Sequence, residues 1–279
     1  MPENSSCSSA STCDKSSCEG CPSNKGPQSF LVEQNKFSNI KNVIGVVSGK
    51  GGVGKSTFCA SVGKMLALHD KRVLLVDMDI GVRSLDILLG VSEKTVYNWG
   101  DVVKNNVDYR KAVIEAGRNL FLLPAPIDFS EEYTPEKFSE CIEKYKKDFD
   151  FIFLDSPAGL ESGFLLSAKA SESCVILSTP DNISIRAASY ACENARKNGV
   201  SDVRLVVNKF NKKLHKKINV DEIIDTVGAR LLGIIPDSQD IYAGVNGGDI
   251  PYDCKGNSAF LRISKRLCGE NIPFRAKNL

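Results

Sequence analysis

The chain has 279 residues, of which 42% are hydrophobic and 25% charged, and its formal net charge is +2. This length suits one large α/β domain with a short appendage, and the near-neutral charge argues against a global attraction to nucleic acid or anionic lipid. No apolar run approaches the ~20 residues that a membrane span requires, and the N-terminal stretch lacks the apolar core of a signal peptide, so we expect a cytoplasmic protein.

Residues 1–37 are rich in Ser, Asn, Lys and Gly and are expected to form a flexible, cysteine-rich arm ahead of a folded body over residues 38–279. Four of the ten cysteines lie in this arm: Cys7, Cys13, Cys18 and Cys21. Four thiols are enough for a zinc ion or an iron–sulfur cluster, and the close pair Cys18 and Cys21 is the most ligand-like part. The irregular outer spacings equally allow an arm that binds no metal.

The strongest motif follows an apolar run at residues 40–47, predicted to be a strand, and precedes a predicted helix over about residues 56–69. A strand, a glycine-rich loop and a helix in this order indicate a phosphate-binding loop. Lys55 is expected to reach the β- and γ-phosphates and Ser56 to bind Mg²⁺, whereas Lys50 is an additional lysine that such a loop does not need. The residues expected to cradle the nucleotide are Gly49, Gly51, Gly52, Val53, Gly54, Lys55, Ser56 and Thr57.

Carboxylates follow two further apolar strands, predicted at residues 73–77 and 150–155. Ligands bind at the carboxyl edge of an open parallel sheet, where these side chains would lie. A carboxylate there, such as Asp77 or Asp79, can hold the hydration shell of Mg²⁺ or orient an attacking water, although an ordinary turn aspartate is an alternative that fits Asp79 better than Asp77. We expect Asp77 and Asp155 to support Mg²⁺.

The remaining pattern alternates strands and helices. Residues 91–118 are expected to be helical with Trp99 as an anchor, and Asn208, at the end of a strand, is a candidate adenine contact, although it could instead be an ordinary turn former. Other predicted strands cover residues 119–124, 173–179, 202–208 and 231–237, and other predicted helices cover 134–146, 183–198 and 259–267. This alternation predicts a doubly wound, mostly parallel sheet with helices on both faces, as in P-loop NTPases.

The loop with its second lysine resembles the deviant Walker A family, the MinD/ParA/Mrp group of dimerising ATPases. The resemblance implies ATP and Mg²⁺ as cofactors and a homodimer around two ATP molecules, in which Lys50 crosses to the nucleotide of the partner. It also implies that Asp79 activates water, and that Asn208 and the Gly-x-Ile-Pro-Asp loop containing Pro236 contact the base. The stretches 79–90 and 155–161 resemble the MinD branch, which implies a spatial regulator such as one that positions the cell division site.

An alternative is an iron–sulfur cluster carrier, since the cysteine arm resembles that of some Mrp proteins. However, Mrp carriers usually have a closely spaced Cys-x-x-Cys in the C-terminal third, and Cys254 and Cys268 do not fit it. A ParA-type DNA scaffold is less favoured: the basic run at residues 209–217 is more typical of a solvated loop, so no specific nucleic acid is expected. A regulatory protein partner is expected but not identified.

Membrane contact through the C-terminus is doubtful on the sequence. MinD proteins commonly continue into an amphipathic helix, and only five residues follow Phe274 here. The cytoplasm is therefore the expected compartment, with peripheral contact at the inner face of the membrane as the alternative.

Overall fold

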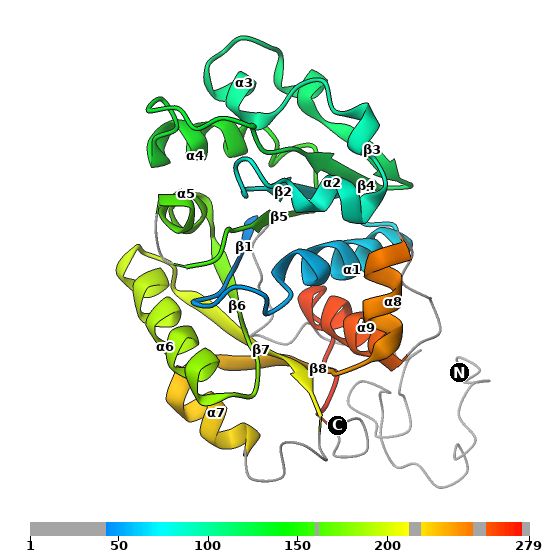
Figure 1. The fold of residues 1–279 in the computed structure, drawn as a ribbon, viewed down its shortest axis with the longest axis vertical. Coiled ribbons are helices and arrows are strands. Elements are labelled where there is room, and N and C mark those ends of the chain that lie inside the picture. The colour runs from blue at the N-terminus through cyan, green and yellow to red at the C-terminus, as the bar shows by residue number, and fades with distance from the viewer. Residues whose placement is uncertain (1–42, 160–161, 212–218, 248–254, 275–279) are drawn as a thin grey trace, which may run out of the picture.

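The computed structural model describes residues 43–159, 162–211, 219–247 and 255–274 (Figure 1). Its strands are β1 (Val43–Val47), β2 (Val73–Asp77), β3 (Ile114–Gly117), β4 (Leu120–Leu123), β5 (Phe151–Asp155), β6 (Ser173–Ser178), β7 (Asp202–Phe210) and β8 (Arg230–Pro236). They form one sheet in the order β3-β4-β2-β5-β1-β6-β7-β8. Neighbouring strands pair in parallel except β3 and β4, which are antiparallel.

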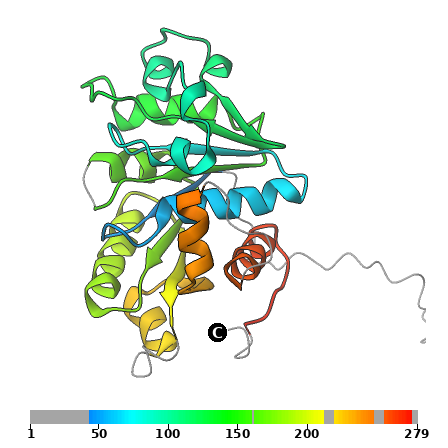
Figure 2. The same cartoon turned by 45° about the vertical axis from the view of Figure 1, so that its right-hand side comes forward.

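Helices cover both faces of this sheet. They are α1 (Lys55–Leu68), α2 (Ser84–Leu89), α3 (Trp99–Val103), α4 (Pro135–Glu143), α5 (Ser162–Ala170), α6 (Asn182–Lys197), α7 (Val220–Val227), α8 (Gln239–Gly247) and α9 (Lys255–Leu267). Figure 2 shows α1, α8 and α9 on one side of the sheet and α6 and α7 on the other. The predicted doubly wound, mostly parallel architecture is confirmed.

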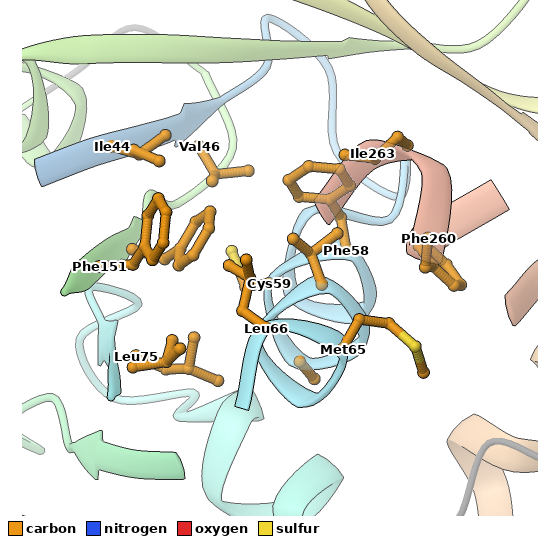
Figure 3. Packing of buried hydrophobic residues seen from close by; sticks show 14 of the residues in the cluster. Ile44, Val46, Phe58, Cys59, Met65, Leu66, Leu75, Phe151, Phe260 and Ile263 are labelled. Atoms are coloured by element: carbon orange, nitrogen blue, oxygen red, sulfur yellow. The ribbon is translucent and has the colours of Figure 1, made fainter. Parts of the chain in front are cut away.

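The central strands are apolar because helices bury them on both faces. All five residues of β1, β2 and β5 are buried, the pattern typical of parallel strands in the middle of a sheet. Figure 3 shows Phe58 and Leu66 of α1 between the sheet and α9, which contributes Phe260 and Ile263. This packing fixes the start of α1, and with it the loop that joins α1 to β1.

The stretch 91–118 differs from the predicted helix. It contains two 3-10 turns (Ser92–Lys94 and Tyr109–Ala112), the short α3 and the strand β3. Asn98 begins α3 by accepting hydrogen bonds from the backbone N–H groups of Gly100 and Asp101. Farther on, Asn119 adopts a positive φ of 59° in the turn that folds β3 back onto β4. A tight turn and a pairing partner outweigh helix propensity there.

Other elements were not predicted, namely α2, α5, α7 and α8. The final helix begins at Lys255, earlier than the predicted residue 259. The cysteine arm, with Cys7, Cys13, Cys18 and Cys21, lies outside the described residues and stays a prediction. In the described ranges, no helix is long and apolar enough to cross a membrane.

Candidate nucleotide-binding site

A pocket of about 390 Å³ lies where the loop between β1 and α1 meets the carboxyl ends of β5, β7 and β8. Gly54, the residue before α1, has φ 96°, a left-handed conformation that favours glycine. The first residues of α1, whose backbone N–H groups have no partner within the helix, line this space, and a helix N-terminus of this kind favours an anion. Many of the predicted site residues line the pocket: Gly52, Gly54, Lys55, Ser56, Thr57, Asp79, Asp155, Asn208 and Pro236.

Lys55 is buried at the base of this pocket. Its ammonium donates a hydrogen bond to Ser48 Oγ at 2.9 Å, and Ser48 Oγ in turn donates to the carbonyl of Lys50 at 2.7 Å. Burial lowers the pKa of Lys55, while the nearby carboxylates of Asp155 and Asp79 oppose this shift. A desolvated ammonium held by one neutral hydroxyl is well placed to bind a phosphate oxygen instead.

Asp155 ends β5 and has an exposed fraction of 1%. Burial, and then the charge of Asp77, raise the pKa of Asp155 to about 7. Its Oδ1 is buried without a hydrogen-bond partner in the described part of the chain, which costs on the order of 1–3 kcal/mol or more for a charged group. Ser56 presents its hydroxyl on the same side of the pocket and accepts a hydrogen bond from Ser84 Oγ at 3.0 Å. A hydroxyl and a carboxylate with one unbonded oxygen are oxygen ligands suited to Mg²⁺.

Asp77 lies next to Asp155 in the β2–β5 register but does not line the pocket. Its carboxylate accepts backbone N–H bonds from Asp79 and Leu85, both at 2.9 Å. Burial raises the pKa of Asp77 to about 6, and these two N–H groups limit the rise. In this conformation the side chain orders the loop that follows β2, and its predicted role at Mg²⁺ stays a prediction.

Asp79 projects into the pocket from the same loop and is half-buried. Burial raises the pKa of Asp79 and the positive charge of Lys55 opposes the rise. Asp79 thus lines the same pocket as the candidate Mg²⁺ ligands Ser56 and Asp155. A carboxylate in this position can accept a proton from water, or hold that water in line with a phosphorus atom.

Two residues at the end of β7 donate hydrogen bonds to the phosphate loop between β1 and α1. Asn208 Nδ2 donates to the carbonyl of Val53 at 2.7 Å, and Lys209 Nζ donates to the carbonyl of Gly52 at 2.9 Å. A side chain at Gly54 would place its Cβ 2.5 Å from Asn208 Nδ2, so this close contact requires glycine. The predicted base contact Asn208 therefore braces the loop in this conformation, and its contact with adenine stays a prediction.

Several lining residues were not predicted. Ser84 comes from the start of α2, and Lys209, Ser238, Ile241 and Tyr242 come from the end of β7 and the segment after β8, next to Asp237 of the predicted Gly-x-Ile-Pro-Asp loop. Lys209 Nζ lies 5.6 Å from the centre of the Tyr242 ring. The sequence feature that could have indicated these lining residues is the end of a strand followed by a polar turn at residues 237–240, because loops at that sheet edge form ligand pockets.

Four predicted loop residues do not line the pocket. Gly49 packs against α6, where an added Cβ would lie 2.3 Å from the carbonyl oxygen of Ala187. Gly51 is exposed, and Val53 is buried with its carbonyl bound by Asn208. Lys50 is also exposed, and its side chain is directed towards Asp181 and not into the pocket beside it.

The arrangement has clear counterparts among known proteins. Residues 44–251 match the family described as the CobQ/CobB/MinD/ParA nucleotide binding domain. The septum site-determining protein MinD of Thermotoga maritima is 36% identical over 244 residues, covering 83% of this chain and 90% of that protein. The MinD of Synechocystis is 34% identical over 250 residues, covering 84% and 92%. This chain belongs to the MinD family.

Solved MinD structures share the fold. The MinC:MinD complex of Aquifex aeolicus matches with a TM-score of 0.78 and 34% identity, covering 84% of this chain and 98% of that one. The MinD of Pyrococcus horikoshii in complex with Mg-ADP matches with a TM-score of 0.74 and 25% identity, covering 82% and 96%. The chain is thus a MinD-like ATPase, which uses ATP and Mg²⁺ and produces ADP and phosphate.

Proposed function

We propose that this MinD-like ATPase is a switch: it dimerises around ATP, changes its protein partners, and resets on hydrolysis. The observation that carries the proposal is the position of Lys50. It belongs to the phosphate loop, yet it does not line the pocket of its own chain and is exposed. Because Lys50 does not face the pocket of its own chain, its positive charge is suited to the phosphate of a nucleotide bound by a second copy of the chain.

Within each chain, we assign the steps of hydrolysis to four residues. Lys55 binds the β- and γ-phosphates, and Ser56 and Asp155 hold Mg²⁺. Asp79 orients the attacking water from the loop that follows β2. Held by Ser56 and Asp155, Mg²⁺ would supply positive charge to the phosphate oxygens, and Lys50 of a second copy would add to that charge.

The cellular role follows from the relatives. Those cited above are named for septum site determination, and one solved relative is a complex of MinD with MinC. We propose that this chain likewise acts in the placement of the division site through a regulatory protein partner that recognises the ATP-bound dimer. We place it in the cytoplasm, with peripheral contact at the inner face of the membrane as the less favoured arrangement.

The test compares Lys50→Ala with Lys55→Ala. Sedimentation velocity with ATP and Mg²⁺ should show a dimer for the native chain and a monomer for both variants. Binding of a fluorescent ADP analogue should survive in Lys50→Ala and be lost in Lys55→Ala, because only Lys55 lies in the pocket of its own chain. An ATP-dependent dimer of Lys50→Ala would refute the proposed role of this lysine.

Metal binding by the N-terminal cysteines is a separate proposal, and it would support the cluster-carrier alternative. The part of the chain that the structure describes contains no group of three or more His, Cys, Asp or Glu residues able to hold a metal. Anaerobic purification with iron, zinc and sulfide analysis, repeated on Cys18→Ser/Cys21→Ser, tests the proposal. Less than stoichiometric metal in the native protein would remove it.

A further inference from the structure

Ser84, the first residue of α2, lines the nucleotide pocket together with Ser56 of α1. The two helices lie side by side (Figure 1). Ser84 Oγ donates a hydrogen bond to Ser56 Oγ at 3.0 Å, although the two residues are 28 positions apart in the chain. Ser56 is the proposed hydroxyl ligand of Mg²⁺. Ser84 is therefore in direct contact with a proposed metal ligand, and the steps of hydrolysis assigned above give it no role.

The residues on both sides of Ser84 are held in place. Leu85 donates its backbone N–H to Asp77 Oδ2, at the buried end of β2, at 2.9 Å. Arg83 has a positive φ of 52°, a left-handed conformation that residues with a Cβ rarely adopt. Its guanidinium pairs with Asp86 at 3.0 Å, and both side chains are mostly buried. A strained conformation persists only where its surroundings enforce it, so the position of Ser84 is determined by the folded loop.

The hydroxyl of Ser56 has one hydrogen to donate and two lone pairs that can accept. Burial and the charge of Asp77 raise the pKa of Asp155, and a hydrogen bond from the Ser56 side chain opposes that rise. The hydrogen of Ser56 is thus directed to Asp155, and Ser84 occupies one of the lone pairs. One lone pair of Ser56 is left for a metal ion.

We propose that Ser84 is a positioning residue, which occupies one lone pair of Ser56 Oγ and so directs the other towards Mg²⁺. Without Ser84, the Ser56 hydroxyl is free to turn about its Cβ–Oγ bond. A hydrogen-bonding partner of a metal ligand fixes the orientation of that ligand, and its loss lowers metal affinity by about 10–100-fold. Ser84 acts through Ser56 and does not bind the metal itself. The proposal rests on the assignment of Mg²⁺ to Ser56 and Asp155 in the proposed function.

The same contact connects the metal ligand to the loop that carries Asp79. This loop runs from the end of β2 to Ser84, and the carboxylate of Asp77 accepts the backbone N–H groups of Asp79 and Leu85. Holding Ser84 at Ser56 therefore also limits the positions that Asp79 can take in the pocket. The metal ligand and the carboxylate proposed to orient water are thereby joined in one hydrogen-bonded network.

The experiment measures the affinity of the full chain for ADP by calorimetry, once in EDTA and once in saturating Mg²⁺. The ratio of the two dissociation constants isolates the contribution of the metal, because a merely structural change in the pocket alters both. The variants are Ser84→Ala, Ser84→Thr, Ser56→Ala and the double variant Ser84→Ala/Ser56→Ala. The control is Ser238→Ala, which removes a hydroxyl from the same pocket, where it bonds to Asp240 at 3.3 Å.

In Ser84→Ala, we expect the ratio to fall by about tenfold while the affinity in EDTA changes less than about twofold. Ser84→Thr should recover most of the ratio, because it restores the hydroxyl, and Ser238→Ala should leave the ratio unchanged. In the Ser56→Ala background, the loss of Ser84 should have no further effect, since Ser84 acts through Ser56.

Two results would overturn the role of Ser84 alone: a native ratio in Ser84→Ala with a reduced one in Ser56→Ala, or losses that add in full in the double variant. A native ratio in Ser56→Ala would instead refute the assignment of the metal to Ser56, and the role of Ser84 with it.

Discussion

The ammonium of Lys50 lies 3.5 Å from Oδ1 of Asp181, the residue that precedes α6. The two residues are 131 positions apart in the chain, and both side chains are about half exposed. Asp181 also accepts the backbone N–H of Ser184 at 2.9 Å and the hydroxyl of Thr179 at 2.6 Å. Burial would raise the pKa of Asp181, but these two hydrogen bonds and Lys50 hold it below its usual value. Asp181 therefore remains charged near neutral pH and holds Lys50 within its own chain.

This contact predicts that Asp181→Asn makes dimerisation easier. Asparagine is as good an N-cap as aspartate and can still bind Thr179 and Ser184, so the start of α6 is preserved. The charge that restrains Lys50 is lost, and an exposed ion pair contributes about 0.2–1 kcal/mol. We expect the ATP concentration at half-maximal dimerisation to fall up to about fivefold in sedimentation experiments. A higher requirement for ATP in Asp181→Asn would show that Asp181 instead assists the dimer.

The raised pKa of Asp155 predicts how the stability of the metal-free protein depends on pH. Asp155 has a pKa of about 7 in the folded chain and about 3.9 when unfolded. Between these values the folded state binds more protons than the unfolded state, so stability falls as pH rises from about 4 to about 7. We expect Asp155→Asn not to lose stability in this way. Its free energy of unfolding, relative to that of the native chain, should rise by up to about 1.4 kcal/mol for each pH unit in that window.

Urea unfolding at several pH values in EDTA measures this difference, and the contributions of carboxylates that do not interact with Asp155 cancel between the two proteins. Asp77 does interact with it, so Asp77→Asn is measured alongside. Because Mg²⁺ binds only the deprotonated carboxylate, adding Mg-ADP should stabilise the native chain most at high pH. Parallel stability curves for the native chain and Asp155→Asn would contradict the raised pKa.

The sequence predicts the phosphate loop and Asp155 because each is a local pattern, in which an apolar strand leads directly into the residues that bind phosphate or metal. The fold follows from the same strands, since an uninterrupted apolar run such as Val73–Val76 indicates burial on both faces. By contrast, β3 was missed because its pairing depends on a turn at Asn119 and not on its own composition.

Contacts between distant segments could not be predicted. Asn208 was expected to contact adenine, and only the folded chain shows its amide 2.7 Å from the Val53 carbonyl, 155 positions away. Lys209 and Tyr242 contact each other at the pocket although they are 33 positions apart in the sequence (242 − 209). The partner of Lys50 is likewise visible only in the folded chain. Loop geometry and side-chain direction determine these contacts, and neither has a periodic pattern in the sequence.

The brace on the phosphate loop predicts the effect of Asn208→Ala. The hydrogen bond from Asn208 to Val53 is buried, and its loss should cost about 1–3 kcal/mol of stability. Because the loop is then less ordered before nucleotide binds, we also expect weaker binding of Mg-ADP, by roughly tenfold. Lys209→Gln is the matched control, since it removes a contact to the adjacent Gly52 carbonyl that is exposed. Calorimetric titration should rank Asn208→Ala as the weaker binder, and the reverse order would place the main support of the loop at Lys209.

Trp99 provides a reporter for the loop that follows β2. It is the only tryptophan in the chain, and its indole N–H donates to the carbonyl of Asp77 at 2.9 Å. Its ring also packs edge-on against Tyr133 and Phe138. Trp99→Phe keeps an aromatic ring but leaves that buried carbonyl without its donor, so it should destabilise the fold by about 1–3 kcal/mol.

In the native chain, movement of Asp79 upon binding Mg-ATP should alter the surroundings of Asp77 and therefore the fluorescence of Trp99. The change should be larger with Mg-ATP than with Mg-ADP, because Asp79 is proposed to act beside the γ-phosphate. Asp79→Asn is the informative variant: it removes the charge that would face this phosphate while leaving the backbone N–H of residue 79 available to Asp77. Identical fluorescence changes with the two nucleotides in the native chain would show that this loop does not sense the γ-phosphate.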